Sequence, residues 1–193
     1  MATVVHPHVE TWEFDALQDD TGWSMGVELI AGEAVFVLPI GPFASSAQVE
    51  LSGALHRWHE DTGDEGLLMI EVFVALPNGS RVGPDIAWWS AARRPPLGRG
   101  AVHAVPDLVV EVLSPSTRAN DLGVKRELYM RSGVRELWLV DPDARTVMRV
   151  RPDTEADEVL GEGQVLRSEL LAGFALEVAR IFPFDPDSAD EGS

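Results

Sequence analysis

Two short apolar segments on either side of one amphipathic helix place the strongest constraint on the fold. Residues 105–113 and 136–140 are rich in Val, Leu and Trp and are bounded by Pro, Ser and Asp, which is typical of buried strands. Between them, from about residue 121, apolar positions recur every three or four residues, and Gly133 stands where a helix commonly ends. Consecutive strands followed by such a strand–helix–strand unit predict a mixed sheet with helices on its faces.

The remaining segments fit this architecture. We expect a helix at residues 11–17, a hairpin at 28–38, a helix at 44–61, and strands at 67–76 and 81–89 joined by a turn at 77–79. A basic loop at 91–104, a strand at 146–150, an acidic loop at 153–163 and a last strand at 174–178 complete the chain. The predicted fold class is α/β (α+β), a mixed sheet flanked by helices with an N-terminal helix and hairpin. Residues 1–184 are expected to form one domain, followed by a disordered acidic tail at 185–193.

Composition excludes several classes of protein. The 193-residue chain contains no cysteine, which excludes disulfides, thiolate metal sites and a cysteine nucleophile. No apolar run approaches the ~18 residues of a membrane span, and the N-terminus lacks the pattern of a signal peptide. We therefore expect a cytoplasmic protein without a membrane partner.

The charge is large and unevenly distributed. The net charge is −17, which opposes the approach of nucleic acid at long range. Residues 81–151 are the exception, with twelve basic and eight acidic side chains. Any polyanion must therefore be attracted by this middle segment. It also contains Lys125, the single lysine among 15 basic residues.

Three carboxylates lie within predicted strands. Asp85 follows Pro84, Asp107 follows Pro106, and Glu111 interrupts an otherwise apolar strand. With the two-residue period of a strand, Asp107 and Glu111 share a face. An unpaired buried carboxylate is costly, so Glu111 needs a cation, a set of hydrogen bonds or a metal. A structural role remains open for each of them: a salt bridge for Glu111, a turn for Asp107 and a strand start for Asp85.

Taken together, these residues indicate a more specific chemistry. Asp85 and Glu111 can converge from adjacent strands, and two carboxylates with room for water suit Mg²⁺ or Mn²⁺. Asp121 and Lys125 are four residues apart and lie on one side of the following helix. A lysine at such a site can orient or deprotonate a metal-bound water and offset charge on a phosphate. The set predicts hydrolysis of a phosphodiester.

These residues resemble a known family, the Uma-two family of restriction-endonuclease-like proteins. The family is common in bacteria and is part of the PD-(D/E)xK nuclease superfamily. The resemblance extends from about residue 27 to 182. It rests on Pro84-Asp85, on residues 106–117 (Pro-Asp-Leu-Val-Val-Glu-Val-Leu-Ser-Pro-Ser-Thr), and on Asp121, Lys125, Tyr129, Gly133-Val134 and residues 138–142 (Trp-Leu-Val-Asp-Pro). Glu28-Leu29-Ile30 and Gly32-Glu33 are similar to the family's N-terminal block.

The resemblance implies a restriction-endonuclease-like core and assigns roles to individual residues. Asp85, Glu111 and the main-chain carbonyl of Val112 would bind the metal, and Glu28, Asp107 and Asp121 would support them. The superfamily's lysine normally lies two residues beyond the glutamate, where this chain has Leu113. In related nucleases that lysine can migrate to the following helix, which here leaves Lys125 as the catalytic candidate.

The chain also departs from the family pattern. Ser46 and Ala47 stand where the family often has a histidine, and Ala31 replaces an aspartate.

The resemblance and the charge pattern together predict the substrate. DNA is the expected partner, with phosphates held by basic residues of the middle segment, namely Arg93, Arg94, Arg99, Arg118 and Arg126. A homodimer would supply the two sites that cutting both strands needs. The alternative is a nuclease fold without catalytic activity that serves as a binding or regulatory module. The acidic net charge and the departures from the family pattern favour it.

Overall fold

A computed structural model of the chain describes residues 5–21, 26–37, 39–98 and 100–184. The described helices and strands occur in the order β1 (Val5–His8), α1 (Thr11–Thr21), β2 (Val27–Ile30), β3 (Glu33–Phe36), α2 (Pro42–Thr62), β4 (Leu67–Ile70), β5 (Val74–Ala75), β6 (Arg81–Val82), β7 (Ile86–Trp89), β8 (Leu108–Val112), α3 (Arg118–Asn120), the π-helix η2 (Asp121–Lys125), α4 (Arg126–Ser132), β9 (Glu136–Asp141), β10 (Thr146–Val150), β11 (Glu158–Gly161), β12 (Val165–Arg167) and β13 (Ala175–Glu177). Short 3₁₀ turns, η1 (Ala91–Arg93) and η3 (Val178–Ile181), lie after β7 and β13.

Six of the described strands form the central sheet, in the order β11-β10-β9-β8-β7-β4. Only the β8–β9 pair is parallel, because α3, η2 and α4 connect these two strands by a crossover. The remaining neighbours are antiparallel. The observed sheet is therefore mixed, as predicted.

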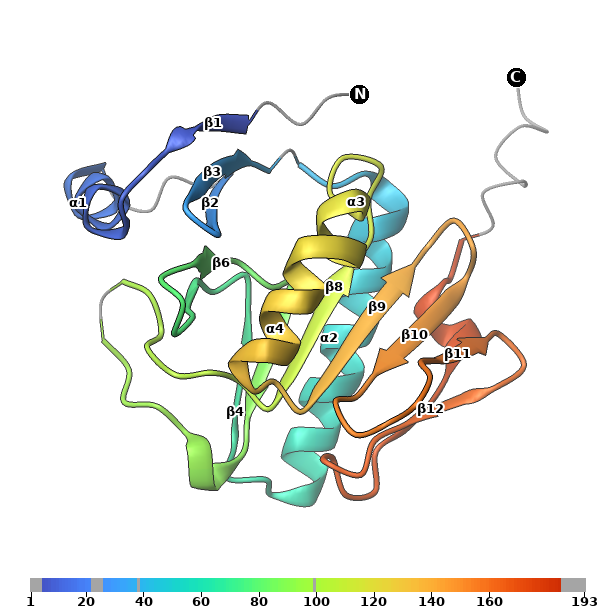
Figure 1. The fold of residues 1–193 in the computed structure, drawn as a ribbon. Coiled ribbons are helices and arrows are strands. Elements are labelled where there is room, and N and C mark those ends of the chain that lie inside the picture. The colour runs from blue at the N-terminus through green and yellow to red at the C-terminus, as the bar shows by residue number, and fades with distance from the viewer. Residues whose placement is uncertain (1–4, 22–25, 38, 99, 185–193) are drawn as a thin grey trace.

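Helices cover both faces of this sheet. In Figure 1, α2 lies behind the sheet, while the continuous α3–η2–α4 segment crosses in front of β8 and β9. Each face has its own apolar cluster: Leu51, Leu55 and Trp138 belong to the α2 side, and Tyr129, Leu137 and Leu139 to the α4 side. Because both faces are covered, every residue of β8 is buried, which explains its nearly continuous apolar sequence.

A second sheet is built around the N-terminal hairpin. Its described strands have the order β1-β3-β2-β6-β5, and β12 pairs with β13 separately. The predicted hairpin is confirmed as β2 and β3, with Leu29 paired to Ala34. The predicted helix ends are confirmed as well: Gly63 and Gly133 adopt left-handed φ values of 64° and 94° after α2 and α4.

Two predicted strands are divided in the structure. Segment 67–76 becomes β4 and β5, and segment 81–89 becomes β6 and β7. The chain turns at Glu71, where φ is +49°, and at Pro84, which has no N–H for a sheet ladder. As a result β4 and β7 stay in the central sheet, while β5 and β6 join the hairpin sheet. The junction between the two sheets therefore lies directly before Asp85.

Other differences from the prediction concern polar segments. The expected loop at 153–163 contains β11, whose residues pair with β10 from Thr146 to Arg149. The helix expected from about residue 121 begins at Arg118 and passes through a π-helical turn. Strands β1 and β12 were not predicted, and the predicted acidic tail lies outside the described residues.

No helix in the described ranges has both the length and the apolar character required to cross a bilayer.

The packing of α2 gives a direct test of this fold. Leu51 is fully buried against the central sheet, so Leu51→Ala should lower the free energy of unfolding by about 2–5 kcal/mol in urea denaturation. Val49, on the same helix, is 64% exposed, and Val49→Ala should change that free energy by no more than about 0.5 kcal/mol. Equal losses in the two variants would contradict the observed orientation of α2.

Candidate active site

Asp85 and Glu111 come from neighbouring strands of the central sheet. Ile86 pairs with Val110, and extending this antiparallel register by one residue places Asp85 opposite Glu111. The main-chain N–H of Val112 donates a hydrogen bond of 2.6 Å to Oδ2 of Asp85, which ties the two strand ends together. The predicted convergence of these two carboxylates is therefore present.

Lys125 joins them from the helix in front of the sheet. Its Nζ lies 2.8 Å from Oε1 of Glu111 and 3.4 Å from Oδ1 of Asp121, which is four residues earlier. Both Asp121 and Lys125 lie in the π-helix η2, a rare form of helix that frequently occurs at functional sites. Both side chains are directed into the protein, with only 2% and 5% of their surface exposed.

Glu28 reaches the same lysine from the hairpin sheet. Its Oε1 lies 3.2 Å from Nζ of Lys125 and accepts a hydrogen bond of 2.5 Å from the main-chain N–H of Gly83. We call Glu28, Asp85, Glu111, Asp121 and Lys125 the buried acidic cluster; Asp85 is half-buried and the other four side chains are buried. The cluster brings together residues from both sheets and from the crossover helix, and it includes four of the carboxylates predicted from the sequence together with the predicted lysine.

Burial dominates the electrostatics of the cluster. It raises the pKa of Asp85 to about 6, although the Val112 N–H and the Lys125 ammonium act in the opposite direction. Burial also raises the pKa of Glu111 well above its usual value, with further contributions from the neighbouring carboxylates. Burial alone would lower the pKa of Lys125, but Glu111 and Glu28 outweigh it and raise that pKa well above its usual value. Lys125 is therefore a firmly held ammonium.

The donor set is compatible with a hard divalent cation. Glu28, Glu111 and Asp121 pair with the one ammonium, and Asp85 lies near them, so carboxylates outnumber cations here. Oδ1 of Asp121 accepts no hydrogen bond and lies 3.4 Å from Nζ of Lys125. Among the described residues, no group of three or more His, Cys, Asp or Glu side chains is arranged to hold a metal by itself. Mg²⁺ commonly retains several waters and binds through only one or two carboxylates. Asp85, Glu111 and the Val112 carbonyl therefore fit Mg²⁺ or Mn²⁺ as a partial set of ligands.

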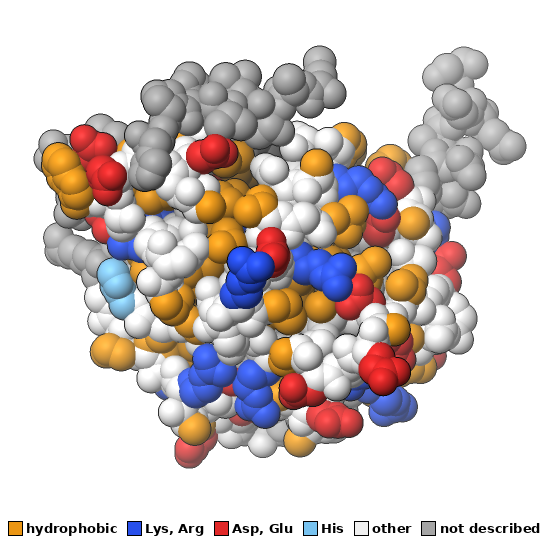
Figure 2. All heavy atoms as spheres, in the orientation of Figure 1, with side chains coloured by type: hydrophobic (Ala, Val, Ile, Leu, Met, Phe, Trp, Pro, Cys, Tyr) orange, Lys and Arg blue, Asp and Glu red, His pale blue; other side chains and the backbone are white. Residues whose placement is uncertain are grey.

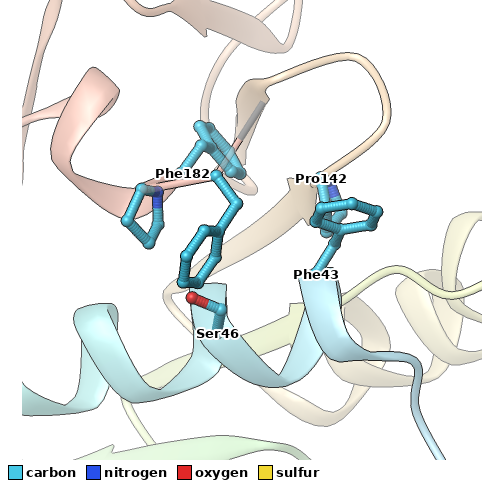
Figure 3. A pocket seen from close by; sticks show the side chains of 6 residues that line it. Phe43, Ser46, Pro142 and Phe182 are labelled. Carbon is cyan, nitrogen blue, oxygen red and sulfur yellow. The ribbon is translucent and has the colours of Figure 1, made fainter. Parts of the chain in front are cut away.

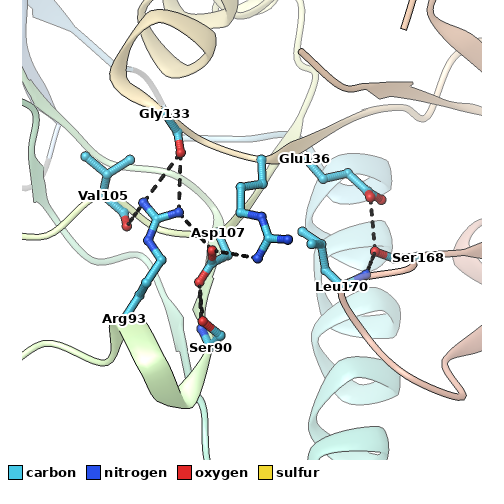
Figure 4. Close-up of polar contacts among 9 residues, drawn as sticks. Ser90, Arg93, Val105, Asp107, Gly133, Glu136, Ser168 and Leu170 are labelled. Carbon is cyan, nitrogen blue, oxygen red and sulfur yellow. Dashed lines mark hydrogen bonds and ion pairs between the residues drawn. The ribbon is translucent and has the colours of Figure 1, made fainter. Parts of the chain in front are cut away.

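Asp107 lies away from this cluster, at the other end of β8. Figure 4 shows its carboxylate between Ser90 and Arg93. It accepts hydrogen bonds of 2.8 Å from the N–H and Oγ of Ser90 and from Nη1 of Arg93. Burial tends to raise the pKa of Asp107, but these hydrogen bonds prevail and hold it below the usual value. Asp107 and Glu111 therefore have separate contacts, at opposite ends of the strand.

The predicted phosphate-binding arginines differ in their surroundings. Arg93 is engaged by Asp107 and also donates to the carbonyl oxygens of Val105 and Gly133. Arg118 pairs with Asp141 at 2.6 Å and Arg126 with Asp157 at 2.8 Å. Arg94 donates to the main-chain oxygen of Glu65. Arg99 lies outside the described residues.

Basic side chains are visible on the face that carries the crossover helix. In Figure 2 they stand in small groups on this face, and several have acidic side chains beside them. Positive and negative side chains therefore alternate on this described surface, in agreement with the ion pairs of Arg118 and Arg126.

Two features of the site were missed by sequence reasoning. The hydroxyl of Tyr129 donates a hydrogen bond of 2.5 Å to Oε1 of Glu111. The spacing of Asp121, Lys125 and Tyr129, each four residues apart, could have indicated it. Glu71, at the left-handed turn, donates its N–H to the oxygen of Asp85 and accepts a hydrogen bond from the buried Gln48. No local sequence pattern predicts the left-handed turn at Glu71.

Ser46 stands where the family often has a histidine, and the structure shows which residues surround it. Ser46 lines a notch of about 10 Å³ with Phe43, Pro142 and Phe182 (Figure 3). This volume is close to the minimum that holds one water molecule. The lining of the notch contains no member of the buried acidic cluster.

Comparisons with known proteins identify the family and the fold. Residues 12–179 match the family described as "Uma2: Putative restriction endonuclease". The fold is similar to that of a protein from Anabaena variabilis described as a putative nuclease belonging to DUF820, with a TM-score of 0.77 and 20% identity over 91% of this chain and 98% of that one. No match is found among the curated proteins. The predicted family resemblance and fold class are thus confirmed.

The depressed pKa of Asp107 predicts a pH-dependent contribution to stability. A carboxylate with a lowered folded-state pKa stabilises the protein above its unfolded pKa, and this stabilisation is lost as pH falls through the folded value. Asp107→Asn should therefore reduce the free energy of unfolding by about 1–3 kcal/mol at pH 7, and the difference from wild type should shrink below about pH 4. Urea denaturation between pH 3 and pH 7 measures it. A difference that does not vary with pH would contradict the assigned ion pair.

Removing the ammonium should destabilise the cluster. Lys125→Met leaves Glu28, Glu111 and Asp121 without their counter-charge, so we expect a loss of about 3–5 kcal/mol at pH 7 without added metal. The double variant Lys125→Met/Glu111→Gln should recover part of this loss because it buries one charge fewer. Arg131→Met, at an exposed surface pair of α4, is the control and should cost less than about 1 kcal/mol. A Lys125→Met protein as stable as this control would contradict the network.

Proposed function

Because this chain belongs to the Uma2 restriction endonuclease family, we propose that it is a metal-dependent DNA endonuclease that hydrolyses phosphodiester bonds. The single observation that carries the proposal is the convergence of Asp85, Glu111 and Lys125 at one end of the central sheet. The convergence uses three different elements, β8, the start of β7 and the π-helix.

Each residue of the cluster has a proposed role. Asp85, Glu111 and the carbonyl of Val112 would hold Mg²⁺ or Mn²⁺. When bound, the ion supplies Lewis acidity and lowers the pKa of a coordinated water. Lys125 orients the attacking water and offsets the charge on the phosphate. Its raised pKa supports this role as a cation rather than as a proton acceptor.

Supporting residues act through the lysine. Glu28 contacts Nζ from β2 and Asp121 contacts it from the same π-helical turn, and together they limit where the ammonium can move. Such restriction favours a reactive geometry because fewer conformations must be lost on reaching the transition state. Asp107 supports the site through the fold, by fixing the other end of β8.

DNA is the proposed substrate despite the acidic net charge. The site lies within the segment of residues 81–151, where basic residues outnumber acidic ones. Arg94, Arg118 and Arg126 would contact phosphates, the latter two by exchanging their present carboxylate partners. Binding of this kind should weaken steeply with added salt.

A nuclease fold without activity is the second candidate, and one observation favours it. Lys125 is already engaged by three carboxylates, so the cluster can be read as an internal ion-pair network that needs no ligand. On this reading the protein would bind a partner through its surface. The two functions differ in whether metal binding and plasmid cleavage depend on the same side chains.

The test is cleavage of supercoiled plasmid in the presence of Mn²⁺. Wild-type protein should convert it to nicked circles, and Asp85→Asn, Glu111→Gln and Lys125→Met should each reduce the rate at least about a hundredfold, since even outer-shell partners of metal ligands typically contribute 10–100-fold. Glu127→Gln and Arg131→Met, at an exposed ion pair of α4, are the matched controls and should cleave at the wild-type rate.

Calorimetric titration with Mn²⁺ separates the two candidate functions. We expect binding to the wild type and to Lys125→Met, and its loss in Asp85→Asn and Glu111→Gln. Cleavage that persists in all three cluster variants would refute the assigned site. Absence of both metal binding and cleavage in the wild type would favour the binding module.

A further inference from the structure

Tyr129 is the polar side chain of the site that the proposed function leaves without a role. It is the only tyrosine in the chain, and it is completely buried in the apolar cluster on the α4 side of the sheet. Its ring alone would satisfy that packing. Its hydroxyl is directed at Glu111, one helical turn beyond Lys125 along the same helix.

The two donors from this helix act on the same oxygen of Glu111. Oε1 accepts the hydrogen bond of 2.5 Å from Tyr129 and lies 2.8 Å from Nζ of Lys125. Among the described residues, no hydrogen bond is formed to the other oxygen, Oε2. The carboxylate is therefore held from one side, and one oxygen is left for a ligand.

This arrangement is what a carboxylate that binds a metal through a single oxygen requires. A carboxylate on a flexible side chain loses rotational freedom when it binds a cation, and a hydrogen bond to the non-binding oxygen removes part of that freedom in advance. Lys125 alone cannot supply the same constraint, because its ammonium is shared with Glu28 and Asp121. Tyr129 has no other hydrogen-bond partner among the described residues.

We propose that Tyr129 is a positioning residue, which holds Oε1 of Glu111 so that Oε2 is presented to a divalent cation. The inference rests on the proposed metal-dependent function and deepens it. It assigns the hydroxyl to metal affinity and to the geometry of Glu111, and it gives Tyr129 no contact with substrate.

The experiment compares Tyr129→Phe with a matched control. Ser168→Ala also removes one buried hydroxyl that donates to a glutamate, because Ser168 Oγ donates to Oε2 of Glu136 at 3.1 Å (Figure 4). Trp138, two residues from Glu136 on the same strand, belongs to the α2-side cluster, so this contact lies on the opposite side of the sheet from Tyr129. In calorimetric titration, Tyr129→Phe should weaken Mn²⁺ binding about 10–100-fold, the range found for outer-shell partners of metal ligands. Ser168→Ala should bind Mn²⁺ with wild-type affinity, even where its thermal stability is reduced.

A further measurement excludes a merely structural role. In plasmid cleavage, Tyr129→Phe should need a higher Mn²⁺ concentration for half-maximal rate, by the same factor, and should approach the wild-type rate at saturation.

The outcomes distinguish the inference from the function on which it rests. If the wild type binds Mn²⁺ and cleaves, but Tyr129→Phe binds Mn²⁺ equally well, the positioning role is refuted and the proposed function stands. If Tyr129→Phe and Ser168→Ala lose affinity to the same extent, the effect is general destabilisation and the positioning role is also refuted. If the wild type neither binds nor cleaves, the function fails and the inference fails with it.

Discussion

The ammonium of Lys125 is the interaction on which the arrangement of this molecule depends. A buried carboxylate is tolerated only beside a cation or a full set of hydrogen bonds, and Glu28, Glu111 and Asp121 all approach this one group. Glu28 lies 97 residues from Lys125 in sequence. The lysine therefore couples the hairpin sheet, the central sheet and the crossover helix, and a displacement of any one of them would leave a charge buried without compensation.

The division of two strands explains how the hairpin sheet can reach the site. Had segments 67–76 and 81–89 continued straight, both would have stayed in the central sheet. The turns at Glu71 and Pro84 instead direct β5 and β6 to the hairpin sheet and leave Asp85 at the junction. The left-handed backbone of Glu71 is uncommon for a residue with a side chain, and its N–H is bound to the carbonyl oxygen of Asp85. The local conformation and the position of a candidate ligand are thus linked.

Much of the site could be predicted because it follows from short-range periodicity. The two-residue period placed Glu111 on a defined face of β8, and the four-residue spacing placed Asp121 and Lys125 together. Periodicity gives a face but no distance. It therefore could not show that Asp107, predicted as a supporting residue on the face of Glu111, binds Ser90 and Arg93 at the far end of the strand. The π-helical turn, the left-handed Glu71 and the strand β11 depend on tertiary contacts, and their sequences carry no local signal for them.

The same ion pairs support a structural and a catalytic interpretation, and the balance of charge distinguishes them. An internal network that serves stability alone approaches neutrality, because each uncompensated carboxylate in a buried region opposes folding. Here three carboxylates pair with one ammonium, and Asp85 nearby is held by the Val112 N–H, with its pKa raised to about 6. This surplus is unfavourable in a purely structural cluster. It would be compensated by a divalent cation, and the excess of carboxylates therefore supports the proposed metal site.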